Sequence, residues 1–171
     1  VLNCIDRHAE KTPEKIAFIW EGECGAVSKI SFQKLNEEVC ALALALSDLG
    51  LVAGDRVCLY MPMIPQMVYA FFASLKLGLI VVPVFSGFGP QPLAVRLEHA
   101  EVKAVFTADG GLRRGKPIDV KLQCDEAVNN APSVKHVIVA KRLYQENIAM
   151  HSDRDLDYES LVAKFRGQAC P

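Results

Sequence analysis

Two glycine-rich segments contain residue types that could bind an anion. The first covers residues 86–90, Ser-Gly-Phe-Gly-Pro, where Gly87 and Gly89 permit a tight turn and the proline suits the first position of a helix. A helix that begins there directs free backbone N–H groups and its positive end outward, which favours a bound anion. The second segment covers residues 108–116 and holds three cations within four residues: Arg113, Arg114 and Lys116. A glycine-rich loop with these charges is well suited to phosphate.

Both segments are expected to follow strands of a parallel sheet. From residue 56 onward, short apolar runs alternate with helical patterns, which is typical of an α/β fold with a mainly parallel sheet flanked by helices. The run at 79–85 is apolar on both faces and favours a central strand. The expected strands are 56–60, 79–85, 104–107 and 136–140, and the expected helices are 65–77, 90–100 and 120–129.

The first 54 residues predict different elements. A short helix is expected over 2–11, followed by a hairpin with strands 16–20 and 26–30. Ser31 is a suitable N-cap for a helix that closes at Gly50. Its apolar residues recur at steps of three and four: Leu35, Val39, Leu42, Leu46 and Leu49. Residues 141–171 are polar, with a modest helix near 158–165.

The fold would bring the two glycine-rich segments together. A right-handed crossover leaves both at the carboxyl edge of one sheet, one or two strand spacings apart, so that they could bind one ligand. The alternative is structural: Gly87 and Gly89 only turn the chain, and the three cations of residues 113–116 are solvated surface charges.

Two other motif matches fail on single residues. Residues 110–116 fit G-x-x-x-x-G-K, but Pro117 stands where a Walker A loop needs a hydroxyl for Mg²⁺ and a backbone N–H. The acidic residues 153, 155 and 157 begin like a calcium loop, yet Tyr158 occupies the position that requires glycine. We therefore expect this acidic run to form a solvated face.

Composition excludes several classes of protein. The 171 residues are 51% hydrophobic and 23% charged, as in a globular domain. The 19 basic and 20 acidic residues nearly cancel, so the chain has no net electrostatic field that would attract nucleic acid or an anionic membrane. The six cysteines and four histidines have no metal-binding spacing. The thiols are expected to be reduced and mostly buried, in a cytoplasmic protein.

Residues 61–85 are too interrupted by Pro and Gly for a membrane span and predict a helix followed by a strand. Because the chain starts with Val1, we expect it to begin inside a longer reading frame.

Several longer phrases carry a resemblance to a known family. They are IAFIWEGE, GDRVCLYMPMIPQM, VFSGFGPQPLAVRLEHAEVKAVFTADGGLRRGKPIDVK and PSVKHVIVAKR, and the tail DLDYESLVAK also fits. Together they resemble the N-terminal region of the AMP-forming acetyl-CoA synthetases, without a gap from Asp55 to Lys121. The resemblance implies the N-terminal part of the large domain of an adenylate-forming enzyme.

The family reaction has two steps. ATP and acetate give acetyl-adenylate and diphosphate, and the thiol of coenzyme A then displaces AMP to form acetyl-CoA. In that family, positions corresponding to Gly87 and to the loop Arg113-Arg114-Gly115-Lys116 contact the 3′-phosphorylated ADP part of coenzyme A. The resemblance implies no catalytic or metal-binding residue in this chain. The loop for ATP phosphates, the acyl pocket, the Mg²⁺ ligand and the catalytic lysine are expected beyond Pro171, so the segment alone should be inactive.

The resemblance divides the chain into three expected regions. Residues 1–54 form a helix, hairpin and helix that pack on the sheet, residues 55–141 form the parallel core with the coenzyme A phosphate loops, and residues 142–171 form a polar connector toward the ATP-binding region. The expected partners are small molecules: a short-chain carboxylate, ATP and coenzyme A. No residue distinguishes acetate from propionate or another short acid. A non-catalytic α/β module that binds a phosphorylated nucleotide is the alternative from a different class.

Overall fold

The core of the protein is a parallel five-stranded sheet. The computed structural model describes residues 1–170, and Pro171 lies outside the described residues. The strand order is β4-β3-β5-β8-β9, and every neighbouring pair is parallel. The strands are β3 (Arg56–Leu59), β4 (Ile80–Pro83), β5 (Ala104–Ala108), β8 (His136–Ala140) and β9 (Asp155–Asp157). The predicted fold class, an α/β fold with a mainly parallel sheet, is confirmed.

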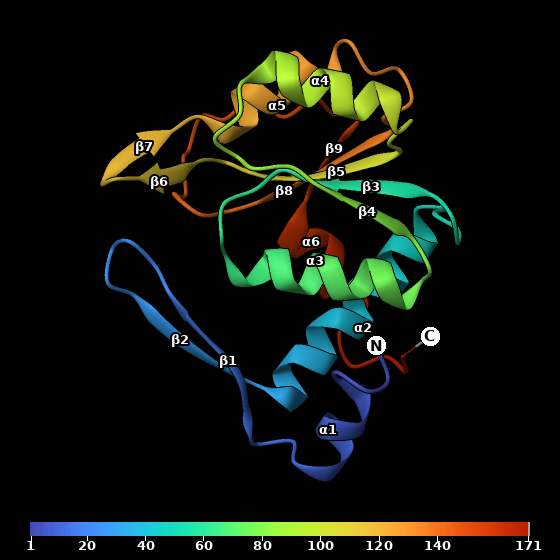
Figure 1. The fold of residues 1–171 in the computed structure, drawn as a ribbon. Coiled ribbons are helices and arrows are strands. Elements are labelled where there is room, and N and C mark those ends of the chain that lie inside the picture. Colours follow the sequence, from blue (N-terminus) through green and yellow to red (C-terminus); the bar gives the residue numbers. More distant parts are fainter. Residues whose placement is uncertain (171) are drawn as a thin grey trace.

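Helices cover both faces of this sheet, as Figure 1 shows. One face carries α4 (Pro90–His99) and α5 (Val120–Val128), and the other carries α2 (Phe32–Asp48), α3 (Pro65–Lys76) and α6 (Tyr158–Ala163). Successive residues of β5 point to opposite faces, so Val105 packs in the core under α4 and α5, while Phe106 packs in the core under α2 and α3. All five residues of β5 are buried, as expected for a strand that is covered on both faces.

Helix α2 forms as its sequence pattern predicts. The Ser31 side chain accepts a hydrogen bond from the Lys34 backbone N–H at 3.2 Å and so caps the first turn. Val39, Leu42 and Leu46 are fully buried. The first helix, α1 (Asp6–Lys11), is shorter than the expected span of 2–11.

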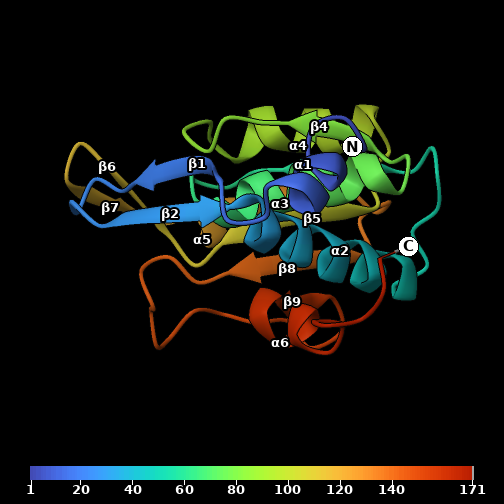
Figure 2. The same ribbon diagram turned by 90° about the horizontal axis from the view of Figure 1, so that it is seen from below.

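Two antiparallel ribbons extend beyond the carboxyl edge of the sheet. One pairs β1 (Ile16–Glu21) with β2 (Val27–Ser31), and the other pairs β6 (Gly111–Arg113) with β7 (Lys116–Ile118). Figure 2 shows the tips of the two ribbons beside each other. The first ribbon is the predicted hairpin, whereas the pattern of the second predicted only a loop.

The prediction of a central strand at 79–85 is wrong. Strand β4 covers only Ile80–Pro83 and lies at the edge of the sheet, where Ile80 is 52% exposed. After α4 the chain crosses back over β3, which places β3 and β5 inside the sheet and leaves β4 with one neighbour. An apolar run indicates a strand but does not specify on which side its neighbours lie.

The apolar stretch at 61–85 forms helix α3 followed by strand β4, as expected. In the part of the chain that the structure describes, no helix combines the length and the apolar character needed to cross a membrane.

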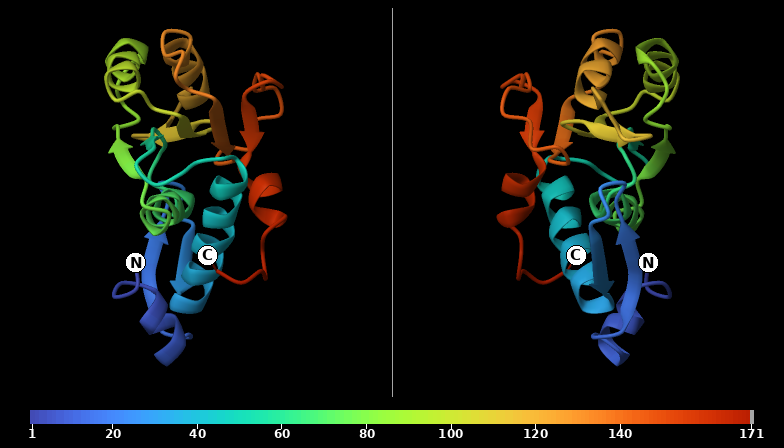
Figure 3. Two further views of the ribbon diagram at one scale, coloured as in Figure 1. Left: turned by 90° about the vertical axis from the view of Figure 1, so that its right-hand side faces the viewer. Right: turned by 90° about the vertical axis from the view of Figure 1, so that its left-hand side faces the viewer.

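The expectation that all cysteines are reduced and mostly buried is also wrong. Cys40 on α2 forms a disulfide with Cys170, with the two Cα atoms 4.9 Å apart. Figure 3 shows why: the C-terminal segment returns to the side of α2. Cys4 and Cys24 are exposed, whereas Cys58 and Cys124 are buried. Spacing along the sequence did not indicate the pairing, because 130 positions separate the two joined residues.

Candidate functional site

Sheet topology brings the two glycine-rich segments to one edge. The segment at 86–90 follows β4 and the segment at 108–116 follows β5, and β3 lies between these two parallel strands. Two strand spacings correspond to about 10 Å. From β3 the chain continues to β4 on one side of the sheet, and from β5 it continues to β8 on the other side, so β3 and β5 form a topological switch point. Proteins with α/β folds commonly bind ligands outside the carboxyl ends of the strands at such a point. The predicted shared edge is therefore confirmed.

A cleft of about 320 Å³ opens at this edge. It lies between the β1–β2 ribbon, the loop after β3, the loop after β4 and the β6–β7 ribbon. Its lining residues are Trp20, Glu21, Gly22, Glu23, Pro62, Met63, Phe85, Ser86, Gly87, Leu112, Arg113, Ile118 and Arg142. Together with Arg142, which follows β8, five segments that are distant in sequence thus form one concave surface.

Gly87 and Arg113 are in close contact within the cleft. A Cβ atom at residue 87 would lie 2.8 Å from Arg113 Nη1 and would also collide with the Phe85 ring. The Arg113 guanidinium lies over that ring, 5.5 Å from its centroid, in a cation–π contact. We expected Gly87 to admit a ligand to the backbone. The structure adds a second requirement, because a side chain at this position would displace Arg113.

The side chain of Tyr60 holds the loop that contains Gly87. The Tyr60 hydroxyl, at the carboxyl end of β3, donates a hydrogen bond to the Phe88 carbonyl oxygen at 2.5 Å. Burial raises the pKa of Tyr60 to about 12, so the hydroxyl remains a donor at neutral pH. The loop is therefore attached to the interior of the sheet.

A tight turn places the cations of the second segment at the tip of the β6–β7 ribbon. Arg114 and Gly115 have φ angles of +52° and +74°, and two such residues between paired strands form the turn that suits a two-residue hairpin. Arg113 and Lys116 are cross-strand partners, which brings two like charges opposite each other. Within residues 1–170, none of the three cations of this ribbon has a carboxylate at ion-pair distance. A bound anion would relieve this repulsion.

The structure therefore separates the five predicted site residues into two groups. Gly87 and Arg113 line the cleft. Arg114, Gly115 and Lys116 lie at the adjacent ribbon tip, where both charged side chains are exposed and do not line the cleft.

Sequence reasoning missed the contribution of the β1–β2 ribbon. The Trp20 indole N–H donates to the Met63 carbonyl oxygen at 2.7 Å, and the Arg142 guanidinium lies 5.3 Å from the Trp20 ring centroid. Arg142 also contacts Cys24 Sγ at 3.5 Å, and this hydrogen bond lowers the pKa of the Cys24 thiol. The single tryptophan of the sequence could have pointed to this hairpin as a contact surface, but the hairpin pattern does not indicate which segments its tip contacts.

Asp109 positions Arg142 from the end of β5. This buried carboxylate accepts hydrogen bonds from the backbone N–H groups of Arg142, Leu143 and Gln145 at 2.7, 3.0 and 3.1 Å. It therefore holds the chain after β8 against the chain after β5, and brings a second guanidinium to the cleft.

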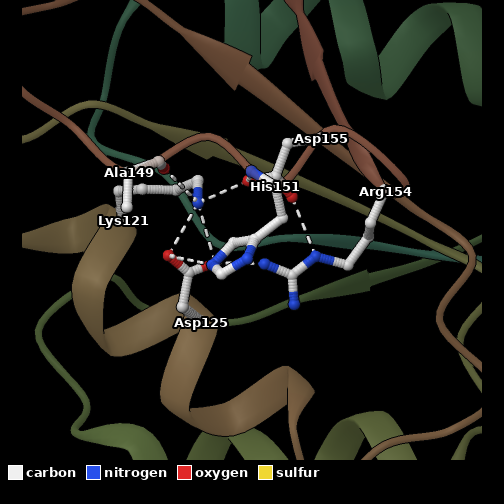
Figure 4. A network of polar contacts seen from close by, with 6 residues as sticks. All are labelled: Lys121, Asp125, Ala149, His151, Arg154 and Asp155. Carbon is white, nitrogen blue, oxygen red and sulfur yellow. Dashed lines mark hydrogen bonds and ion pairs between the residues drawn. The ribbon is translucent and has the colours of Figure 1, made fainter.

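A second polar cluster lies under α5, and Figure 4 shows its six residues. Asp125, His151 and Asp155 could together offer ligand atoms to a metal ion, since these atoms lie within 4.8 Å of one another. However, Lys121 Nζ already lies 2.7 Å from an oxygen of each carboxylate, and Arg154 contacts both at 2.6 and 2.8 Å. Two cations therefore balance two carboxylates, and the cluster is an ion-pair network.

This network corrects the expectation that the acidic run at 153–157 is a solvated face. The Asp155 side chain is 0% exposed and Lys121 is 3% exposed. Burial opposes ionisation of Asp155, but hydrogen bonds from Arg154, Lys121 and the His151 backbone N–H outweigh it, and the pKa of Asp155 is lowered. Strand β9 pairs with β8 and carries Asp155 inward, which a stretch of alternating acidic residues did not reveal.

Comparison with known proteins identifies the class to which this fold and cleft belong. Residues 5–164 match the family described as AMP-binding enzyme, and the chain therefore belongs to that family.

Individual relatives are acetyl-CoA synthetases by name. The chain is 44% identical over 171 residues to acetyl-coenzyme A synthetase of Gamma-proteobacterium EBAC31A08, covering 99% of this chain and 26% of the relative. It is 49% identical to the protein of that name from Mycolicibacterium smegmatis, covering 99% and 18%. The solved acetoacetyl-CoA synthetase from Streptomyces lividans superposes with a TM-score of 0.86 at 29% identity, covering 96% of this chain and 25% of that one. The chain thus spans about a quarter or less of the length of these relatives.

Proposed function

We propose that this chain is the nucleotide-binding part for coenzyme A in an AMP-forming acetate–CoA ligase. The ligase would convert ATP, acetate and coenzyme A to acetyl-CoA, AMP and diphosphate through acetyl-adenylate. The observation that carries the proposal is the cross-strand pair Arg113 and Lys116, two cations without a carboxylate partner among the described residues, beside the cleft that contains Gly87. The names of the relatives support acetate over propionate or another short acid.

Each predicted site residue has a separate role in this proposal. Arg113 and Lys116 bind phosphate oxygens of the 3′-phosphorylated ADP portion, because charge-assisted hydrogen bonds are the strongest that side chains offer to phosphate. Arg114 strengthens the positive field at the ribbon tip. The turn at Gly115 keeps both strands in register, and Gly87 leaves room for Arg113 beside the ligand.

No residue of this chain has a catalytic or metal-binding role in the proposal. ATP and Mg²⁺ are cosubstrate and cofactor of the whole ligase, and their binding groups are placed outside these 171 residues. The regional division at residues 54 and 141, the role of residues 142–171 as a connector and a cytoplasmic location belong to the same proposal.

Substitution of Arg113 tests the proposal. A charge-assisted hydrogen bond contributes about 1.5–3 kcal/mol, so Arg113→Ala in the ligase that carries this chain should raise the KM for coenzyme A about tenfold or more. The KM for ATP should stay unchanged. Arg7→Ala, on exposed α1, is the matched control and should change neither constant. A raised KM for ATP with an unchanged KM for coenzyme A would show that the site is assigned wrongly.

Diphosphate exchange separates the ligase from a non-catalytic nucleotide-binding module. A ligase exchanges labelled diphosphate into ATP only when its carboxylic acid is present, and acetate should support faster exchange than propionate. The absence of exchange with every short acid would favour the module.

A further inference from the structure

The tip of the β6–β7 ribbon already binds one anionic group in this structure. The Gly115 backbone N–H donates a hydrogen bond to Glu23 Oε2 at 3.0 Å. Glu23 belongs to the tip of the β1–β2 ribbon, 92 positions earlier in the sequence, and it also lines the cleft. The contact between the two ribbon tips is therefore a contact between a carboxylate and an outward-facing N–H.

The geometry of the turn explains why this N–H is available. With Arg114 and Gly115 at positive φ, the ribbon reverses direction at these two residues, and the Gly115 N–H points out of the ribbon at its end. Arg113 and Lys116 flank the same turn as cross-strand partners. An oxygen of a phosphate that binds these two cations would meet the same N–H that Glu23 occupies.

We propose that Glu23 limits the preference of this site for coenzyme A over ligands without a phosphate, because it competes with the ligand phosphate for the Gly115 N–H. This inference rests on the proposed function. A carboxylate and a phosphate oxygen repel each other and do not share one donor, so Glu23 must leave the turn when the ligand binds. Ligands with weakly charged or missing phosphates do not displace it. The carboxylate therefore lowers the affinity for ligands that place a phosphate at this turn and leaves the affinity for unphosphorylated ligands unchanged.

Glu23→Gln tests the competition, since glutamine retains the shape of the side chain and loses its charge. Isothermal titration of coenzyme A into the ligase should show about three- to tenfold tighter binding for the variant than for the wild type, because one unfavourable charge near the phosphate is removed. The gain should shrink between 0.05 and 0.5 M NaCl, since salt screens exposed charges. Glu14→Gln removes an exposed carboxylate before β1 and should leave the affinity unchanged.

The ligand series measures the effect on specificity. The ratio of affinities for adenosine 3′,5′-bisphosphate and adenosine should be about three- to tenfold larger in Glu23→Gln than in the wild type, because adenosine has no phosphate for the carboxylate to repel. Equal or weaker binding of coenzyme A by Glu23→Gln would overturn the inference and make Glu23 a structural tie between the ribbons. Failure of the proposed function is recognised separately, since Arg113→Ala would then leave coenzyme A affinity unchanged whatever residue stands at position 23.

Discussion

At the residue scale, the ammonium group of Lys121 shows how the interior tolerates charge. It is almost completely buried and contacts Asp125, Asp155 and the Ala149 carbonyl oxygen. The network joins α5 to the segment that leads into β9 and thereby holds residues 149–155 against that helix. Its members are polar residues whose pairing depends on the tertiary fold, which is why sequence patterns did not reveal them.

Lys121→Met should lower the free energy of unfolding by about 3 kcal/mol, because removing one partner leaves buried carboxylates with too little positive charge. Urea denaturation of the whole protein that carries this chain measures the loss. Lys135→Met changes an exposed lysine before β8 and should alter stability by less than about 0.5 kcal/mol. Equal stability of the two variants would contradict the stabilising role of the network.

The same network predicts a dependence of stability on pH. The pKa of Asp155 is lowered in the folded protein, so its contribution is fully present above the unfolded value of about 3.9. That contribution is lost as the pH falls from about 4 through the lower folded pKa. In thermal denaturation from pH 7 to pH 2.5, Asp155→Asn should therefore show a smaller loss of stability below pH 4 than the wild type. Asp153→Asn, at an exposed neighbour, should follow the wild-type profile. Parallel profiles for Asp155→Asn and the wild type would contradict the lowered pKa.

At the element scale, the β6–β7 ribbon positions the cations through the conformation of its turn. Gly115 has a φ angle of +74°, which is strained for any β-branched residue. Gly115→Val should therefore distort the turn and raise the KM for coenzyme A about fivefold or more. Arg114→Asn is the matched comparison: asparagine tolerates positive φ, so the turn persists and only one exposed charge is lost. That variant should raise the KM less than about threefold. A larger effect of Arg114→Asn than of Gly115→Val would show that charge at residue 114, and not ribbon geometry, controls binding.

The elements that were predicted correctly have long or strongly patterned sequences. Helix α2 has a cap and four regularly spaced leucines or valines, and the alternation from β3 to β8 specifies a parallel sheet. Strands β6, β7 and β9 have three residues each, too few for a periodic pattern to appear. The edge position of β4 was missed because pairing order is decided by where α4 returns the chain, and no local residue reports that.

At the scale of the whole molecule, the candidate site exists only because distant segments meet at one edge of the sheet. The positions of Gly87 and Arg113 could be predicted, because the handedness of crossover connections places successive loops on the same side. The role of the β1–β2 ribbon could not, because Trp20 and Glu23 reach the cleft through a hairpin whose direction depends on packing. Family resemblance named the candidate phosphate-binding residues, and the fold explains why Gly87 and Arg113 lie together in the cleft.

In the proposed function, the cations of the β6–β7 ribbon bind the 3′-phosphate of coenzyme A. The most direct measurement is isothermal titration of coenzyme A and 3′-dephospho-coenzyme A into the whole protein that carries this chain and into its Arg113→Ala variant. The wild type should bind coenzyme A about tenfold or more tightly than the dephosphorylated ligand, and the variant should reduce this ratio to about one or two. An Arg113→Ala variant that retains the full wild-type ratio would contradict the claim.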